Sequence, residues 1–181
     1  MEFQDGRRRR RMVRRFTDEP VDPDAVDRLV RNAVRAPSAG FAQGWSFLVL
    51  TEPDDVARFW SATSPEQPER SMSAWLAGMR TAPVLVVVLT SKDVYLDRYA
   101  EDDKGWADRD ENRWAVPYWH VDAGMAALLM LQTAVDEGLG ACFFGVAPGE
   151  VGRLRAAFGS PDASAPPRVV AWRGDPAPSP G

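Results

Sequence analysis

Apolar side chains recur every three or four residues along several segments of the chain, which is the spacing of amphipathic α-helices. Val26, Leu29 and Ala33 define one such face, and the acidic turn with Pro23 ahead of them is typical of a helix start. Residues 36–40 end this helix, because proline and glycine disfavour its continuation. Further helices are predicted at Pro53–Thr63 and at residues 72–80 and 148–158, with a loop at residues 64–70.

Four short runs have the composition of β-strands. The run at residues 84–89 is almost continuously apolar and lies between Pro83 and Thr90, which predicts a central strand buried on both faces. The other three runs are Trp45–Leu50 and residues 141–146 and 168–172. Strands and helices do not alternate strictly along the chain. The sequence therefore predicts an α+β fold rather than a doubly wound parallel sheet.

Residues 123–137 are predicted to form a long helix that is apolar almost all round. A helix of this kind has to be buried in a core or in a subunit interface. We expect Asp122 to cap its start and Gly138 to end it. The Gly138-Leu139-Gly140 sequence is not interpreted as a dinucleotide-binding loop, because it follows a helix and precedes a strand.

The segment 92–119 differs from the rest of the chain in its broken hydrophobic pattern. It mixes charged residues with six aromatic ones, and we interpret it as a partly helical excursion from the body. The aromatic residues are Tyr95, Tyr99, Trp106, Trp114, Tyr118 and Trp119.

Length and composition indicate one globular domain. The chain has 181 residues, of which 45% are hydrophobic and 27% charged. A single cysteine, Cys142, and a single histidine, His120, exclude a disulfide framework and any zinc site built from several cysteines or three histidines. The longest apolar runs fall short of the roughly 20 residues that cross a membrane. We expect a soluble, cytoplasmic protein with a flexible basic leader at residues 1–9, one domain at 10–176 and a flexible tail at 177–181.

Charge is distributed unevenly. Residues 1–15 hold seven arginines against two acidic residues, a net charge of +5, so the remainder of the chain carries −9 to reach the total of −4. A twin-arginine export signal is excluded because Arg14-Arg15-Phe16 leads into a polar stretch. The acidic body argues against nucleic acid as a partner. Guanidinium groups at residues 10–14 suit a small phosphate-bearing ligand, whereas for residues 7–9 a solvated charged tail is one of the alternatives.

The side chains offer no constellation for nucleophilic catalysis. His120 and Cys142 are both best explained as packed residues, so a bound cofactor is expected to supply any chemistry. The small residues of 36–44 would let the backbone approach a flat polar ring closely.

Several motifs occur in order between Arg10 and Pro176 and together resemble the nitroreductase-like FMN-dependent flavoproteins. They are Arg10-Arg11-Met12-Val13-Arg14-Arg15-Phe16 with Pro20-Val21, Ala36-Pro37-Ser38-Ala39-Gly40 with Gln43 and Trp45, Ala82-Pro83, Asp122-Ala123-Gly124, and Gly138-Leu139-Gly140-Ala141-Cys142-Phe143-Phe144-Gly145. The resemblance implies a layered α+β fold with a central, mainly antiparallel sheet and a long buried helix at a dimer interface. It also implies a homodimer that binds FMN between its subunits and moves hydride from NAD(P)H to an acceptor.

Site residues follow from the resemblance position by position. Arg10, Arg11 and Arg14 are similar to the contacts of the FMN phosphate and ribityl chain, and Met12 stands where the family usually has a serine. Pro37, Ser38 and Ala39 resemble the segment that lies against the isoalloxazine of the partner's cofactor. Gln43 also matches this segment, whereas Phe41 replaces a usual asparagine. Phe144 and Gly145 resemble the segment whose backbone amide faces flavin N5.

The resemblance departs from the family after Gly174-Asp175-Pro176, where a basic arm usually follows and this sequence ends at Gly181. Three explanations are open. Either the arginine-rich leader replaces the missing arm, or FMN binds more weakly, or the FMN site has decayed.

The family places a variable segment at 92–119, beside the open face of the flavin. Its aromatic residues either anchor the segment or wall a slot for a flat acceptor such as a nitroaromatic or a quinone. The residues expected to form this substrate pocket are Phe41, Tyr99, Trp106, Trp114 and Tyr118. The alternatives are a flavin-dependent dehydrogenase or dehalogenase on the same fold, and a non-catalytic protein that binds flavin or a small aromatic molecule.

Overall fold

The computed structural model describes residues 2–64, 72–159 and 168–173 of the chain. Four strands in this part form one antiparallel sheet in the order β1-β2-β4-β3. Their bounds are β1 (Trp45–Leu50), β2 (Val84–Thr90), β3 (Gly140–Gly145) and β4 (Arg168–Arg173). Within the described residues, the only parallel pairing is the isolated bridge between Met12 and Ala141. The predicted α+β class is confirmed.

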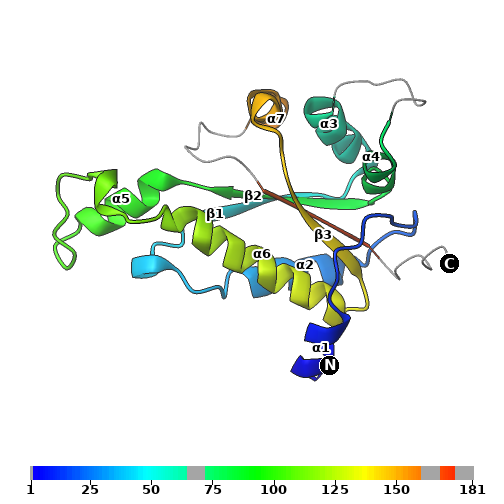
Figure 1. Cartoon of the computed structure of the whole chain (residues 1–181), viewed down its shortest axis with the longest axis horizontal. Coiled ribbons are helices and arrows are strands. Elements are labelled where there is room, and N and C mark those ends of the chain that lie inside the picture. The colour runs from blue at the N-terminus through cyan, green and yellow to red at the C-terminus, as the bar shows by residue number, and fades with distance from the viewer. Residues whose placement is uncertain (1, 65–71, 160–167, 174–181) are drawn as a thin grey trace.

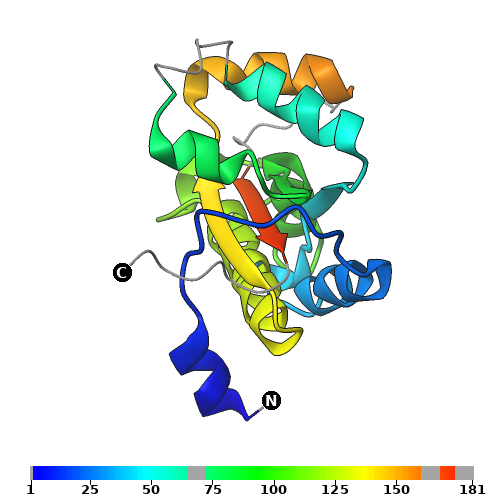
Figure 2. The same cartoon turned by 90° about the vertical axis from the view of Figure 1, so that its right-hand side faces the viewer.

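Helices cover both faces of the sheet (Figures 1 and 2). On one face lie α2 (Pro23–Ala33) and α6 (Tyr118–Asp136), and on the other lie α3 (Pro53–Thr63), α4 (Ala74–Met79) and α7 (Val151–Phe158). Successive side chains of a strand point to opposite faces. Val86 of β2 accordingly packs with the α2 and α6 layer, and Val87 with the α3 and α7 layer. The prediction that this strand is buried on both faces is confirmed.

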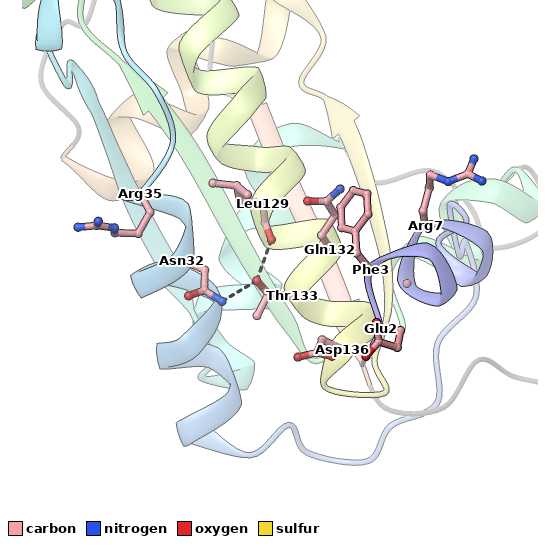
Figure 3. A pocket seen from close by; sticks show the side chains of 10 residues that line it. Glu2, Phe3, Arg7, Asn32, Arg35, Leu129, Gln132, Thr133 and Asp136 are labelled. Carbon is pink, nitrogen blue, oxygen red and sulfur yellow. Dashed lines mark hydrogen bonds between the residues drawn. The ribbon is translucent and has the colours of Figure 1, made fainter.

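Helices α2 and α6 are joined by side-chain contacts as well as by apolar packing. Arg28 donates from Nε and Nη2 to the two carboxylate oxygens of Glu137, at 2.6 and 2.7 Å. Asn32 donates to Thr133 Oγ1 at 2.9 Å, and that hydroxyl donates to the Leu129 carbonyl (Figure 3). These contacts hold α6, the longest helix of the described chain, against α2.

The start of α6 differs from the sequence prediction. The helix begins at Tyr118 rather than at Ala123, because nothing in the sequence after Pro117 interrupts it. Asp122 therefore lies in the second turn of the helix and is not its cap. Its side chain is buried, at 1% exposure. The predicted end is confirmed, since Gly138 follows the helix with a φ of 76°.

Residues 3–9, which belong to the segment predicted as a flexible basic leader, form α1 (Phe3–Arg9). Two side-chain contacts at i,i+3 spacing support this short helix: Arg7 with Gln4, and Arg8 with Asp5. Its last turn carries three arginines, and cations are favourable at a helix C-terminus. Helix α1 buries none of its residues and projects away from the sheet (Figure 2).

The excursion at 92–119 is partly helical, as predicted, with α5 (Lys92–Ala100) and a 3₁₀ turn at Glu111–Arg113. Its aromatic rings form their own small core. Trp114 lies 4.4 Å from Tyr99, 5.4 Å from Trp106 and 5.6 Å from Tyr118 between ring centroids.

Some predictions fall partly or wholly outside the described residues. They are the loop at 64–70 beyond Ser64, the Gly174-Asp175-Pro176 motif and the tail at 177–181. Within the described residues, no helix is both long and apolar enough to cross a membrane.

Candidate functional site

The arginine-rich segment runs along the outer edge of β3. Val13 N–H donates to the Ala141 carbonyl at 2.9 Å, and Phe143 N–H approaches Met12 Sδ at 3.4 Å. Met12 thus contributes its sulfur to the edge contact. Gly78 of α4 lies against the carbonyl of Arg14, where a Cβ atom would come within 2.2 Å. The segment is fixed from both sides by backbone contacts.

The guanidinium groups of this segment face different surroundings. Arg11 lines a hollow of about 380 Å³ over the end of α6 and the start of β3, together with Arg8 and Arg9. Arg10 is half-buried, and its Nη1 is buried with no hydrogen-bond partner in the described structure. Buried donors are almost always paired, so this nitrogen is suited to an acceptor from a ligand. Arg14 is exposed on the same segment. The arginines therefore fit the anionic phosphate that the resemblance implies.

The other end of β3 presents a backbone amide at the same edge. The groups of Ala141 and Phe143 that contact residues 12 and 13 point outward from the sheet, and alternation along the strand gives Gly145 the same direction. Beside Gly145 lies a hollow of about 390 Å³, lined also by Phe143, Phe144, His120 and Gly124. Gly145 is exposed, so its amide is suited to the polar edge of a flat ring.

The side chain of Phe144 does not point along this edge of the sheet. It packs into the layer formed by α3, α4 and α7. Its ring packs with Phe59, Trp60 and Trp75. Cys142 points to the same layer and is 3% exposed. Burial raises the pKa of its thiol, although the charge of Arg14 lowers it in part. The prediction that Cys142 is a small buried residue is confirmed.

The turn at 38–43 has an unusual backbone. Gly40, Phe41 and Gln43 have φ values of 59°, 59° and 52°. Gln43 N–H donates to Ser38 Oγ at 2.8 Å, and Ala39 N–H donates to Asp122 Oδ2 at 2.8 Å. These bonds fix the turn to the N-terminal part of α6.

Within one chain, α6 separates this turn from the Gly145 hollow. His120 and Gly124 are one turn apart, and Asp122 is about 160–200° away from both around the helix axis. The hollow beside Gly145 is therefore on one flank of α6 and the 38–43 turn on the other. The structure brings Arg10, Arg11, Met12 and Arg14 to the edge that also carries Phe144 and Gly145. It does not bring Pro37, Ser38, Ala39 or Gln43 to that edge.

The five residues expected to form a substrate pocket divide into two groups. Tyr99, Trp106 and Trp114 contact one another and support the excursion, which favours their interpretation as anchors. Phe41 and Tyr118 are 75% and 40% exposed. An acceptor wall stays a prediction, and these two side chains are the most exposed of the five.

A further hollow of about 420 Å³ lies between α1, α2 and α6 (Figure 3). Phe3 of α1 stands beside Leu129 and Gln132 of α6 there, and its side chain is 67% exposed. This hollow does not include Gly145 or the residues beside it.

Four residues that matter to this geometry were not predicted as site residues. Gly124 and His120 line the hollow at Gly145, Arg98 donates to the Gly40 carbonyl, and Gly78 accommodates the arginine segment. The one usable signal in the sequence was His120 and Gly124 at i,i+4 spacing on a helix. The contact of Arg98 depends on tertiary structure alone.

Comparison with known proteins places the chain in a family. The profile described as "Nitroreductase family" matches residues 8–172, so the chain belongs to the nitroreductase family. The NfrA1 nitroreductase of B. subtilis has a similar structure, with a TM-score of 0.73 and 20% identity, covering 98% of this chain and 68% of that chain. A nitroreductase-type protein of Desulfovibrio desulfuricans in complex with FMN gives a TM-score of 0.69 with 23% identity, covering 100% of this chain and 90% of that chain.

Relatives in sequence have different activities. The 5,6-dimethylbenzimidazole synthase of Rhodospirillum rubrum is 36% identical over 90 residues, covering 44% of this chain and 43% of the relative. The FMN reductase (NADPH) of Bacillus subtilis is 24% identical over 154 residues, covering 84% and 57%. An iodotyrosine deiodinase of Haliscomenobacter hydrossis is 28% identical over 95 residues, covering 44% and 43%. The chain thus spans about half the length of these relatives. Family membership supports an oxidoreductase that uses FMN.

Proposed function

We propose that this protein is an FMN-dependent oxidoreductase that transfers hydride from NAD(P)H to a small, flat acceptor such as a nitroaromatic or a quinone. The observation that carries the proposal is the edge of β3. An unpartnered guanidinium nitrogen of Arg10 lies at one end, and the outward amide of Gly145 lies at the other. Gly145 lies four positions after Ala141, the residue that is bridged to Met12, a span of about 13 Å along the strand. An elongated ligand with an anionic end and a ring end would bridge it.

The protein residues have binding and orienting roles in this proposal. Arg10, Arg11 and Arg14 bind the phosphate through charge-assisted hydrogen bonds. The amide of Gly145 donates to the polar edge of the ring, while the Phe144 side chain anchors the strand behind it. Bound FMN supplies hydride chemistry at N5, which no side chain of the chain provides.

A homodimer would complete the site. The side chains of Tyr118, Val121, Met125 and Leu128 form an exposed apolar stripe along α6. On the helix, this stripe lies between the flank of Gly124 and the flank of Asp122. Two copies related by a twofold axis through the stripe would place the 38–43 turn of the partner beside Gly145. The separation of the turn from the hollow within one chain supports this arrangement.

The first test is whether the purified protein binds FMN. We expect a yellow protein with a flavin absorbance spectrum and release of FMN on heating. Anaerobic titration with NADH and NADPH should bleach the spectrum, and a nitroaromatic or quinone should restore it. A flavin-bound protein that neither donor bleaches would contradict the proposed NAD(P)H reaction, and the non-catalytic alternative is the one that the departures at Met12 and Phe41 favour.

A second candidate function is flavin-dependent dehalogenation or dehydrogenation. The partial matches to iodotyrosine deiodinase and 5,6-dimethylbenzimidazole synthase favour it. Release of iodide from a halogenated phenol by the donor-treated protein, with no turnover of quinones or nitroaromatics, would establish dehalogenation instead. We also propose a cytoplasmic location, which agrees with the single, unpaired and buried Cys142.

A further inference from the structure

The turn at 38–43 holds two residues in a conformation that their side chains disfavour. Phe41 and Gln43 are two of the three non-glycine residues with positive φ in the described chain. The left-handed conformation is unfavourable for residues that carry a Cβ atom, and it persists only where surrounding contacts impose it. Phe41 is also 75% exposed, so burial of its own side chain does not explain its conformation.

A buried carboxylate holds one side of this turn. Asp122 Oδ2 accepts a hydrogen bond from Ala39 N–H and another from Tyr95 Oη, both at 2.8 Å. Asp122 is 1% exposed and Tyr95 is fully buried. Burial and the bond to Asp122 raise the pKa of Tyr95, so its hydroxyl remains a donor throughout the physiological range.

Arg98 of α5 holds the other side. Its Nε donates to the carbonyl of Gly40 at 2.9 Å. The two remaining nitrogens bind the carboxylate of Asp103 at 2.7 and 2.9 Å, which orients the guanidinium group. The Tyr99 ring lies directly beneath Gly40, where a Cβ atom would come within 2.6 Å. The excursion therefore contacts the middle of the turn at the point where the chain becomes left-handed.

We infer that Arg98 and Asp122 are positioning residues that hold the 38–43 turn in the conformation required to contact the cofactor. This inference rests on the proposed function for the identity of the ligand. It gives the excursion a role that its sequence did not suggest: α5 and its aromatic core support the cofactor-binding turn from beneath.

Arg98→Met is the informative variant, because it removes the bond to Gly40, and the other contacts that it removes are those to the exposed carboxylates of Asp103 and Glu101. Arg113→Met is a matched control. Arg113 binds Asp108 in the same excursion, and neither of these hydrogen bonds involves the turn. We expect Arg98→Met to weaken FMN binding by about tenfold or more, the range for one hydrogen bond from a charged donor, and Arg113→Met to leave it unchanged.

A second measurement does not depend on any cofactor. Amide hydrogen exchange in a peptide covering residues 38–44 of the flavin-free protein should be at least about fivefold faster in Arg98→Met than in the wild type or in Arg113→Met. Unchanged exchange in Arg98→Met would overturn the inference, whether or not the protein binds FMN. Wild-type protein that does not bind FMN would contradict the proposed function instead, and it would also remove the cofactor-directed role from the inference.

A double-mutant cycle separates positioning from general destabilisation. Glycine adopts positive φ without penalty, so Phe41→Gly should reduce the need for Arg98. We expect Arg98→Met to weaken FMN binding by about threefold or less in the Phe41→Gly background, against about tenfold in the wild type. Equal effects in both backgrounds would show that Arg98 does not act through the conformation of residue 41 and would overturn the inference.

Discussion

The indole of Trp60 lies parallel to the ring of Phe144, with the ring planes 4° apart and the centroids 5.8 Å apart. Phe59 and Trp75 meet the same ring edge-on. This aromatic cluster holds the end of β3 from the α3 and α4 side. Backbone N–H groups alternate between the two sides of a strand, so the amide of Gly145, like that of Phe143, points to the open edge of the strand that this cluster anchors.

Trp60→Ala should destabilise the fold strongly, because Trp60 is 3% exposed and the substitution leaves a cavity beside Phe144. We expect a loss of about 3–5 kcal/mol in the free energy of unfolding, measured by urea titration. Trp75→Ala is the matched control, since its ring also meets Phe144 but is 42% exposed. A loss as large in the control would show that burial of Trp60 is not the cause.

Arg11→Ala combined with Arg14→Ala should weaken FMN binding by about a hundredfold or more, since each charge-assisted hydrogen bond contributes roughly 1.5–3 kcal/mol. The matched control is Arg31→Ala with Arg58→Ala, which removes the same charge from exposed arginines on α2 and α3. Isothermal titration of the flavin-free proteins with FMN measures both. Equal affinity of the two double variants would remove the arginine segment from the phosphate site.

The sequence predicted those parts of the fold that short-range patterns determine. The β-branched run of β2 is compatible only with a buried strand, and the amphipathic pattern of α2 only with a helix. Both elements lie where the sequence predicted them. The start of α6 was predicted wrongly because aspartate is a common helix cap. In the structure, the carboxylate of Asp122 instead accepts hydrogen bonds from Ala39 N–H and Tyr95 Oη. The sequence alone does not distinguish an acidic residue that caps a helix from one that is buried as a hydrogen-bond acceptor, because the groups that donate to it come from distant parts of the chain.

The candidate site was predictable only as far as the family motifs reach. The placement of Arg10 and Gly145 at one edge agrees with the resemblance, because the segment before α2 and β3 carry the motif residues. The aromatic cluster around Trp114 was ambiguous from composition, since packing and substrate contact use the same residue types. The contact between Arg98 and Gly40 joins residues 58 positions apart and leaves no local pattern.

Leu128→Glu should disrupt the proposed homodimer. Leu128 is 46% exposed on the apolar stripe of α6, and a charge there would be buried without a partner in the interface. The matched control is Val94→Glu, which places a charge at another exposed apolar residue, on α5. Light scattering should show dimers for the wild type and Val94→Glu, and monomers for Leu128→Glu. A wild-type protein that binds flavin as a stable monomer would contradict the shared site.

Stability should fall in acid through the Arg28–Glu137 pair. The two hydrogen bonds from Arg28 hold the pKa of Glu137 below its ordinary value. A carboxyl group with a lowered folded-state pKa stabilises the fold above its ordinary pKa, and this contribution is lost as the pH falls through the folded-state value. The Tm of Glu137→Gln should therefore be lower than that of the wild type at neutral pH, and this difference in Tm, here called the gap, should become smaller as the pH is lowered. Asp27→Asn, which removes an exposed pair with Arg31, should show a smaller gap.

Substrate selection should depend on the two exposed aromatic residues rather than on the packed ones. Phe41 lies on the turn and Tyr118 is the first residue of the apolar stripe on α6, whereas Trp114 packs against the other rings of the excursion. An aromatic pair contributes about 0.5–1.5 kcal/mol beyond its buried area. Phe41→Ala and Tyr118→Ala should therefore raise the KM for aromatic acceptors by up to about tenfold and leave the reaction with NAD(P)H nearly unchanged.

Trp114→Ala should instead lower the Tm, because five aromatic neighbours lose their common contact. Stopped-flow measurement of flavin reduction and reoxidation separates the two half-reactions, and thermal melts report stability. If neither Phe41→Ala nor Tyr118→Ala slows reoxidation by aromatic acceptors, these side chains do not contact the acceptor. The hollow beside His120 and Gly124 would then be the next surface to test, since it lies against Gly145 and is built from α6 and β3, not from the excursion.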